Sequence, residues 1–294
     1  MLYLFIVSII WAFSFGIIKD ALTGLNPNIV AFVRLAISFM LFAPLLRLKD
    51  VDRKLALKLI GIGAVQYGLM YITYIYSFQY LKSFQVALFT IFTPLYVTLI
   101  YNVYQKHFYK LNFFTTLLTI AGTAIVNGQN LLQWELWVGF LFVQASNICF
   151  AYGQIAYKQL LNNKPHIKDQ HIFALLYLGA VLITAISSLI FADWGKTVFT
   201  QKQILALLYL GLIASGVGFF LWNFGARRTN AGALAIFNDL KIPLAVTVSL
   251  LVFGEKTNVP NLLIGGAMIL TALAINEVAV RRPNRSTLQE VSEV

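Results

Sequence analysis

The sequence is short of charge, of acidic residues and of cysteine. Charged residues make up only 11% of its 294 residues, whereas a soluble domain typically carries about 25%. Because 59% of the residues are hydrophobic, an ordinary soluble domain is excluded and an integral membrane protein is indicated. The single cysteine, Cys149, lies in an apolar run, and a lone cysteine cannot form an intrachain disulfide.

Sequence motifs of enzyme chemistry are missing as well. The chain contains no HExxH, no GxSxG, no P-loop and no Cys/His spacing typical of a metal site. We therefore expect no enzymatic activity, no metal and no cofactor, and the missing P-loop argues against an ATP-driven pump. The net charge of +11 does not point to nucleic acid, because the basic residues lie in short loops between apolar runs.

Ten apolar runs fill most of the chain, and each is long enough to cross a bilayer as a helix. Their limits are residues 2–18, 29–46, 57–78, 84–104, 111–127, 134–158, 172–192, 204–225, 231–253 and 260–278. We predict an all-α integral membrane protein with ten transmembrane helices. Residues 281–294 are polar and charged, and we expect them to form a disordered tail.

The basic residues fall mainly on one side of these predicted helices. Fifteen of the 22 lysines and arginines lie on the side of the N-terminus, and five lie on the other side. Since basic loops stay in the cytoplasm, we expect both termini, and therefore the tail, to be cytoplasmic. The remaining two basic residues, Arg34 and Lys241, lie within predicted spans.

The two halves of the chain resemble each other. Pro94 and Pro243 lie 149 residues apart, each inside a predicted span and before a leucine, and residues 8–19 resemble residues 147–158. We predict one five-helix repeat over residues 1–128 and a second over 129–280. Because five is odd, the second repeat is inverted, as in transporters that alternate access around a central site. Each proline kinks its helix, which suits either a gating hinge or a static bend.

The most informative polar residues lie in the ninth predicted span. A lysine at the middle of a membrane costs about 3 kcal/mol or more unless it faces protein or water, so Lys241 needs partners. Helical periodicity places Asn238 on the same face as Lys241 and Asp239 on nearly the opposite face. Lys241 is therefore a candidate contact for a substrate anion, with an interhelical anchor as the alternative. Asp239 is a candidate coupling group or amine partner, with a pair to another helix or a position at the edge of an aqueous cavity as the alternatives.

Further candidates line up on other predicted spans. Tyr67, Tyr71 and Tyr74 share one helical face and predict either an aromatic cavity wall or ordinary packing. Trp222 suits an interfacial belt, a gate or a substrate contact. The full set of predicted substrate-binding residues is Lys241, Asn238, Tyr67, Tyr71, Tyr74, Gln85, Asn147 and Trp222.

Arg34 and Glu255 receive mainly structural interpretations. Arg34 lies near the outer end of its predicted span, where we expect it to snorkel to the surface, to cap a carbonyl or to pair with Asp20. A part in an outer gate is the alternative. Glu255 precedes Thr257, Asn258 and Pro260, and we expect it in an outer loop beside the start of the tenth predicted span, where negative charge is favourable.

Several short features together resemble one transporter family. They are Trp11 with Lys19, Asn26-Pro27 before Phe32-Val33-Arg34, Ser83 before Pro94, then Trp222, Arg227-Arg228, Gly232, Pro243 and Phe253-Gly254-Glu255-Lys256. With the repeat, they resemble the EamA-type ten-helix members of the drug/metabolite transporter superfamily. The resemblance implies a central cavity lined by spans one, three, four, six, eight and nine. It also implies the movement of small metabolites, often the export of amino acids or other organic solutes.

The chain departs from that family pattern in two places. Residues 104–107 read YQKH where the second half has FGEK, and Lys241 occupies a position that is usually apolar in the family. We expect an alternating-access carrier in a bacterial inner membrane for a small organic solute with a carboxylate, such as an amino acid, in the export direction. The alternatives are an exporter of amines or cationic drugs that uses Asp239, and a flippase for lipid-linked solutes. A homodimer is the only protein partner that we expect.

Overall fold

The computed structural model describes residues 2–49, 51–105, 121, 125, 133–162, 164–228 and 231–281. The side chains of residues 98, 101–105, 231–236 and 239, and of several residues beyond 268, are not among those described. All regular structure in these ranges is helical, which confirms the predicted all-α class.

Helix starts in the first half follow from local sequence. Asn26 caps α2 (Pro27–Phe42): its side chain accepts a hydrogen bond from the Asn28 N–H, and Pro27 occupies the first turn. Asp52 caps α3 (Arg53–Gly63) by accepting from the Leu55 N–H. The other elements are α1 (Leu2–Ile17), η1 (Ile18–Leu22), η2 (Ala43–Leu45), η3 (Ala64–Leu69), α4 (Met70–Tyr80), α5 (Ser83–Phe89), η4 (Thr90–Phe92) and α6 (Thr93–Gln105).

The second half begins with two long helices, α8 (Trp134–Asn162) and α9 (Asp169–Phe191). Thr200 and Gln203 then form a capping box at the start of α10 (Gln201–Tyr209). The remaining elements are η6 (Trp194–Lys196), η7 (Leu210–Val217), α11 (Gly218–Arg228), α12 (Ala231–Leu251) and α13 (Val259–Arg281).

Six helical segments of the described ranges are long and apolar enough to cross a membrane. They cover Leu2–Leu22, Pro27–Leu45, Arg53–Tyr80, Trp134–Asn162, Asp169–Phe191 and Gln201–Arg228, and they match six of the predicted spans. Shorter apolar helices at Ser83–Val97, Leu240–Leu251 and Val259–Met268 fall in three more. The predicted span 111–127 lies outside the described residues apart from 121 and 125, so the ten-helix count stays a prediction. The same holds for the tail beyond residue 281, the orientation of the termini and the repeat boundaries.

The two prolines that the predicted repeat relates have different local surroundings. Pro243 lies inside α12, as predicted. Pro94 is the second residue of α6, and the 3-10 turn η4 comes just before it, so the change from α-helix to 3-10 turn lies on the N-terminal side of the proline. A proline is tolerated in a first helical turn because its missing N–H would have no partner there. The break between α5 and α6 therefore precedes Pro94, and the gating role of both prolines stays a prediction.

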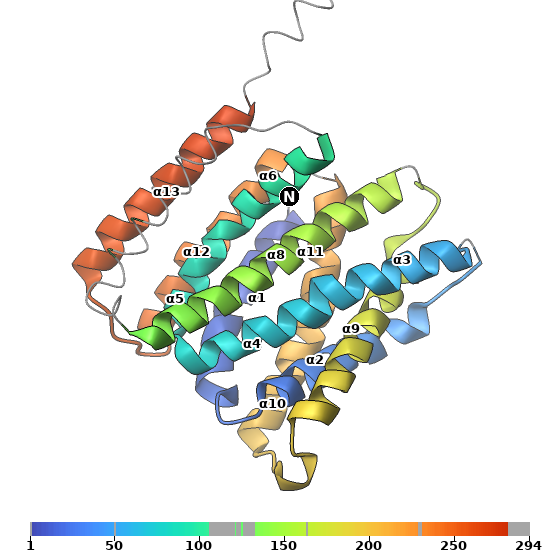
Figure 1. Ribbon diagram of the computed structural model, residues 1–294, viewed down its shortest axis with the longest axis horizontal. Coiled ribbons are helices and arrows are strands. Elements are labelled where there is room, and N and C mark those ends of the chain that lie inside the picture. Colours follow the sequence, from blue (N-terminus) through green and yellow to red (C-terminus); the bar gives the residue numbers. More distant parts are fainter. Residues whose placement is uncertain are drawn as a thin grey trace, which may run out of the picture. The chain divides into compact units, whose positions relative to one another are not determined.

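Helix packing joins segments that are remote in sequence (Figure 1). The described residues up to Gln105 form one compact unit with residues 133–256, and α13 belongs to a second unit. Within the first unit, α2 and α3 pack on α9, α4 packs on α8, and α12 packs on α1 and α5. The contact between α3 and α9 is close: a Cβ added to Gly63 would lie 1.9 Å from the Leu176 carbonyl oxygen, and one at Gly179 would lie 1.9 Å from that of Ile60.

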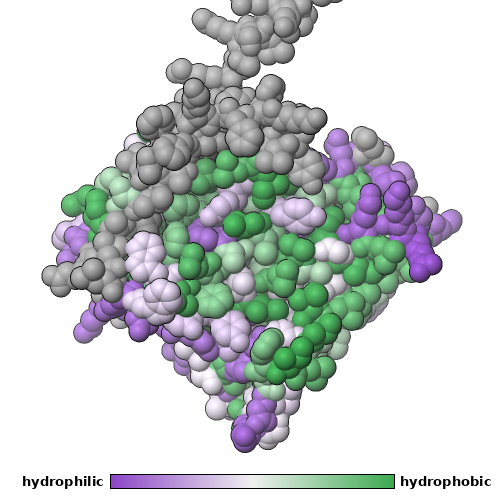
Figure 2. All heavy atoms as spheres, viewed as in Figure 1, coloured by the Kyte–Doolittle hydropathy of each residue, from purple (hydrophilic) through white to green (hydrophobic). Residues whose placement is uncertain are grey.

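The surface of the described helices is apolar along their middle parts. Figure 2 shows apolar residues over much of the displayed face and a hydrophilic cluster where α3 begins and α8 ends. On α9, Leu182, Ile186, Leu189 and Ile190 are 50–75% exposed. A large exposed apolar area is expected where helices face lipid rather than water, so the fold is that of an integral membrane protein.

Candidate functional site

A cavity lies among the helices of the first unit. Its lining residues come from α1, η1, α2, α4, η4, α6, α8, α11 and α12, and they are Trp11, Ser14, Phe15, Ile18, Arg34, Met70, Tyr71, Tyr74, Thr90, Thr93, Ser146, Asn147, Phe150, Phe219 and Lys241. The empty volume, counted with the space at its mouth, is about 550 Å³. Small-molecule sites combine an apolar wall with a few polar groups, and the lining of this cavity has that character.

Lys241 brings a buried ammonium to the cavity. The residue is 5% exposed, and its Nζ donates a hydrogen bond to Asn238 Oδ1 at 3.3 Å, so the predicted shared face of these two residues is confirmed. Three aromatic rings surround the ammonium: Nζ lies 5.4 Å from the ring centroid of Trp11 and 6.0 Å from those of Phe150 and Trp222. Such cation–π contacts stabilise a desolvated ammonium and leave it attractive to an anion.

Arg34 brings a second cation to the cavity, against expectation. The residue is 1% exposed, so it does not snorkel, and Asp20 instead pairs with Lys202 at 2.8 Å. Arg34 Nη2 donates to Tyr71 Oη at 2.8 Å and to Ser215 Oγ at 3.1 Å. The prediction that Arg34 snorkels is wrong because α4 and η7 cover the side chain, a contact that local sequence does not encode.

Two π-helical segments shape the surroundings of Arg34. The segment η3 ends just before Tyr71, and Ser215 lies within η7. The widened turns of η7 leave carbonyl groups for side chains: Ser215 Oγ donates to Leu210 O at 2.7 Å, and Tyr177 Oη donates to Ser215 O at 2.7 Å. Short π-helical insertions are frequent at functional sites, and here they place two hydroxyl groups against one guanidinium.

An aromatic series connects the two cations. The guanidinium of Arg34 lies 4.7 Å from the Tyr71 ring centroid. The Tyr71 and Phe219 centroids are 5.6 Å apart, and those of Phe219 and Trp11 are 5.3 Å apart. Trp11 is fixed by its Nε1–H, which donates to Ala214 O at 2.9 Å, and its ring faces the ammonium of Lys241.

Four of the predicted binding residues line this cavity: Tyr71, Tyr74, Asn147 and Lys241. Asn147 also fixes the break between α5 and α6, because its Nδ2 donates to Phe89 O at 2.8 Å and its Oδ1 accepts from Thr93 Oγ1 at 3.1 Å. A polar side chain of α8 therefore holds the backbone next to Pro94.

The other four predicted residues lie outside the lining, and one of them, Asn238, accepts from Lys241. Tyr67 is buried, and its hydroxyl accepts from Asn223 Nδ2 at 2.8 Å. Trp222 is also buried, and its Nε1–H donates to Gln154 Oε1 at 3.3 Å. Gln85 caps α5, where its Oε1 accepts from the backbone N–H of residue 82 at 2.9 Å. The side chain of Asp239 falls outside the described residues, so its coupling role stays a prediction.

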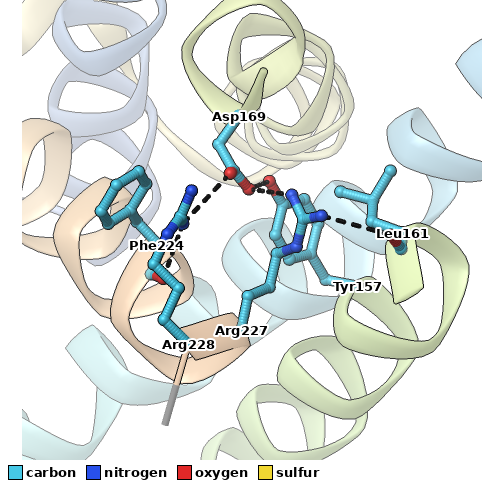
Figure 3. A network of polar contacts seen from close by, with 6 residues as sticks. All are labelled: Tyr157, Leu161, Asp169, Phe224, Arg227 and Arg228. Atoms are coloured by element: carbon cyan, nitrogen blue, oxygen red, sulfur yellow. Dashed lines mark hydrogen bonds and ion pairs between the residues drawn. The ribbon is translucent and has the colours of Figure 1, made fainter. Parts of the chain in front are cut away.

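An ion-pair network closes the end of the bundle where α8 and α11 finish and α9 begins (Figure 3). Asp169, the first residue of α9, is 2% exposed and accepts from Arg227 Nη1 at 2.8 Å and from Tyr157 Oη at 2.5 Å. Arg228 lies 3.5 Å from the second carboxylate oxygen, and Arg227 Nη2 also donates to Leu161 O at 3.2 Å. Sequence reasoning missed Asp169, although an acidic residue at the start of an apolar run was a usable signal.

A second polar contact joins remote segments at the opposite end. Glu255 accepts from the N–H and Oγ of Ser83 at 2.9 and 2.7 Å and from the N–H of Phe84 at 3.2 Å. Lys82 Nζ donates to Lys256 O at 2.8 Å. We expected Glu255 beside the start of the helix that follows it, whereas its carboxylate contacts the start of α5, whose free N–H groups and dipole favour an anion.

Comparisons with known proteins agree with this architecture. The sequence matches the EamA-like transporter family over residues 1–128 and again over 137–277. A biotin transporter of Salmonella typhimurium is 34% identical over 94% of this chain and 92% of its own length, and one of Escherichia coli K12 has the same values. A probable biotin transporter of Pseudomonas aeruginosa is 31% identical over 96% and 99%.

Structural comparison gives the same fold. A crystal structure at 17% identity matches with a TM-score of 0.70 over 96% of this chain and 97% of its own. In the described residues, no group of three or more His, Cys, Asp or Glu side chains is placed to hold a metal. Both halves of the sequence match one transporter family, and relatives of nearly the same length are named transporters. The chain therefore belongs to the EamA-like transporter family of the drug/metabolite transporter superfamily, and it is a membrane transporter of small molecules.

Proposed function

We propose that this protein is a carrier for biotin and that Lys241 binds the carboxylate of the substrate. The observation that carries the proposal is the position of Lys241, a buried ammonium in an aromatic-lined cavity. The names of relatives at 34% and 31% identity support biotin as the solute. Biotin combines a carboxylate with an apolar chain and a compact fused ring, which match the charge and the aromatic wall of the cavity.

The composition of the lining favours biotin over an amino acid. An amino acid carries an ammonium next to its carboxylate, and that ammonium needs a carboxylate or several carbonyl acceptors in a buried site. The described lining contains two cations and no carboxylate. The same argument disfavours amines and cationic drugs, because a cationic solute would be repelled by Arg34 and Lys241 at close range.

The two ends of the bundle supply contacts suited to alternating access. The Asp169 network joins α8, α9 and α11 at the predicted cytoplasmic end, and Glu255 joins the segment after α12 to α5 at the predicted outer end. In an alternating-access cycle these contacts would open in turn while the cavity stays between them. Export, the direction that the family resemblance implies, stays a prediction.

Uptake and efflux of labelled biotin in proteoliposomes test the proposal. The variants are Lys241→Met, Lys241→Arg, which keeps the charge, and Lys202→Met, which removes an exposed lysine as a control. A hydrogen bond to a charged group contributes about 1.5–3 kcal/mol, so Lys241→Met should weaken biotin binding roughly 10- to 150-fold. Lys241→Arg should retain part of the affinity, and Lys202→Met all of it.

Two results would contradict the proposal in different ways. A wild-type protein that neither binds nor moves biotin is not a biotin carrier. A Lys241→Met variant that transports biotin normally would show that Lys241 is an interhelical anchor, with the substrate bound elsewhere. The ratio of efflux to uptake measured in oriented vesicles decides the direction.

A further inference from the structure

Arg34 has hydrogen-bonding capacity that the fold leaves unused. The side chain is 1% exposed and lines the cavity. Its Nη2 has two hydroxyl partners, but its Nε and Nη1 have no hydrogen-bond partner among the described residues. Buried donors are nearly always paired, and a buried arginine normally has an anion or several acceptors around it.

A purely structural role accounts for only part of this arrangement. Through Nη2, Arg34 connects α2 to Tyr71 of α4 and to Ser215 of η7, and a static anchor needs no more than that. The unpaired Nε–H and Nη1–H groups belong to a side chain that lines the cavity. They can donate to an acceptor atom of a bound molecule without disturbing the hydroxyl contacts.

The two cations of the cavity lie beside different aromatic rings. Arg34 lies over Tyr71, whereas Lys241 lies near Trp11, Phe150 and Trp222. Between these rings stands Phe219, in contact with both Tyr71 and Trp11. A solute that lies along this aromatic series meets a hydrogen-bond donor at each end and apolar surface between them.

We propose that Arg34 is a second substrate-binding residue, which donates to a neutral carbonyl oxygen at the end of the solute remote from the carboxylate. This inference rests on the proposed function. In biotin the remote acceptor is the oxygen of the cyclic urea, and Lys241 then holds the carboxylate. Arg34 therefore selects for a urea or amide oxygen, and it rejects analogues with a cation at that place through charge repulsion.

Competition against labelled biotin with two analogues tests this assignment. Biotinamide lacks the negative charge of the carboxylate, and 2-iminobiotin carries a guanidinium in place of the urea. The protein variants are Arg34→Met, Lys241→Met and Ser215→Ala. Ser215 lies outside the cavity lining and accepts from Arg34 Nη2, so its loss misplaces the guanidinium and keeps the charge.

Each of the two cations should control a different one of the two preferences for biotin. The wild type should prefer biotin over 2-iminobiotin by about tenfold or more, and Arg34→Met should remove most of that preference. Lys241→Met should keep it and instead remove the preference for biotin over biotinamide. Ser215→Ala should reduce the preference over 2-iminobiotin by about threefold in a protein that still folds, so the test remains decisive if Arg34→Met does not fold.

Other outcomes overturn the assignment. Unchanged discrimination against 2-iminobiotin in both Arg34→Met and Ser215→Ala would show that Arg34 is a structural anchor. Loss of that discrimination in Lys241→Met would exchange the roles of the two cations. If the wild type binds none of the three compounds, the proposed function itself fails and this inference fails with it.

Discussion

Replacing Asp169 by asparagine should destabilise the protein more than any change in an exposed ion pair. The carboxylate of Asp169 is 2% exposed and faces Arg227, whose side chain is 14% exposed, and Arg228, which is 53% exposed. Asparagine has the same size and still accepts from Tyr157, but it leaves the charge of Arg227 without compensation. The perturbation is therefore electrostatic rather than steric.

The burial of Asp169 and its partners determines how much stability the substitution removes. Removing one member of a buried ion pair costs about 3–5 kcal/mol. We take the lower end, about 3 kcal/mol, because both arginines retain some contact with solvent and screening reduces the loss. At about 2 °C per kcal/mol for a chain of this size, the unfolding temperature should fall by about 6 °C.

Thermal unfolding of the purified protein in detergent measures this difference. The matched control is Asp20→Asn, which removes an ion pair with Lys202 in which both side chains are at least half exposed. Exposed pairs contribute about 0–1 kcal/mol, so the control should shift by less than about 2 °C. Equal decreases in unfolding temperature for Asp169→Asn and Asp20→Asn would refute the reasoning that burial makes the Asp169 network contribute more to stability than an exposed ion pair.

Two further predictions concern packing and capping. Gly63→Ala places a Cβ against the Leu176 carbonyl oxygen and should cost about 1–3 kcal/mol. The added Cβ of Gly61→Ala on the same helix meets nothing within 4 Å, and this variant should be more stable by up to about 1 kcal/mol. Equal unfolding temperatures of the two variants would contradict the close α3–α9 contact. Glu255→Gln weakens the acceptor at the start of α5 and should cost about 1 kcal/mol. It should also speed hydrogen exchange at the Ser83 amide, and unchanged exchange would mean that the contact does not persist in solution.

Periodicity and composition identified the membrane class, most helices and part of the site. Apolar runs of sufficient length predicted nine of the described helical segments, because the length needed to cross a bilayer is a property of one segment alone. The shared face of Asn238 and Lys241 also followed from the sequence, since positions three apart on one helix meet whatever surrounds them. The predicted cavity face of the third span holds for only some of its tyrosines. Tyr71 lines the cavity, whereas Tyr67 hydrogen-bonds to Asn223 outside the lining.

Only the tertiary structure decided which remote segments meet. From its place near a helix end, Arg34 was expected to snorkel, to cap a carbonyl or to pair with Asp20, but its guanidinium donates to Ser215, 181 residues further along the chain. Asp169 reaches its arginines across 58 and 59 positions, and Glu255 reaches α5 across 172. A sequence period specifies which face of a helix is polar, but not which neighbouring helix covers that face. The helix packing therefore decides that Arg34 lines the cavity.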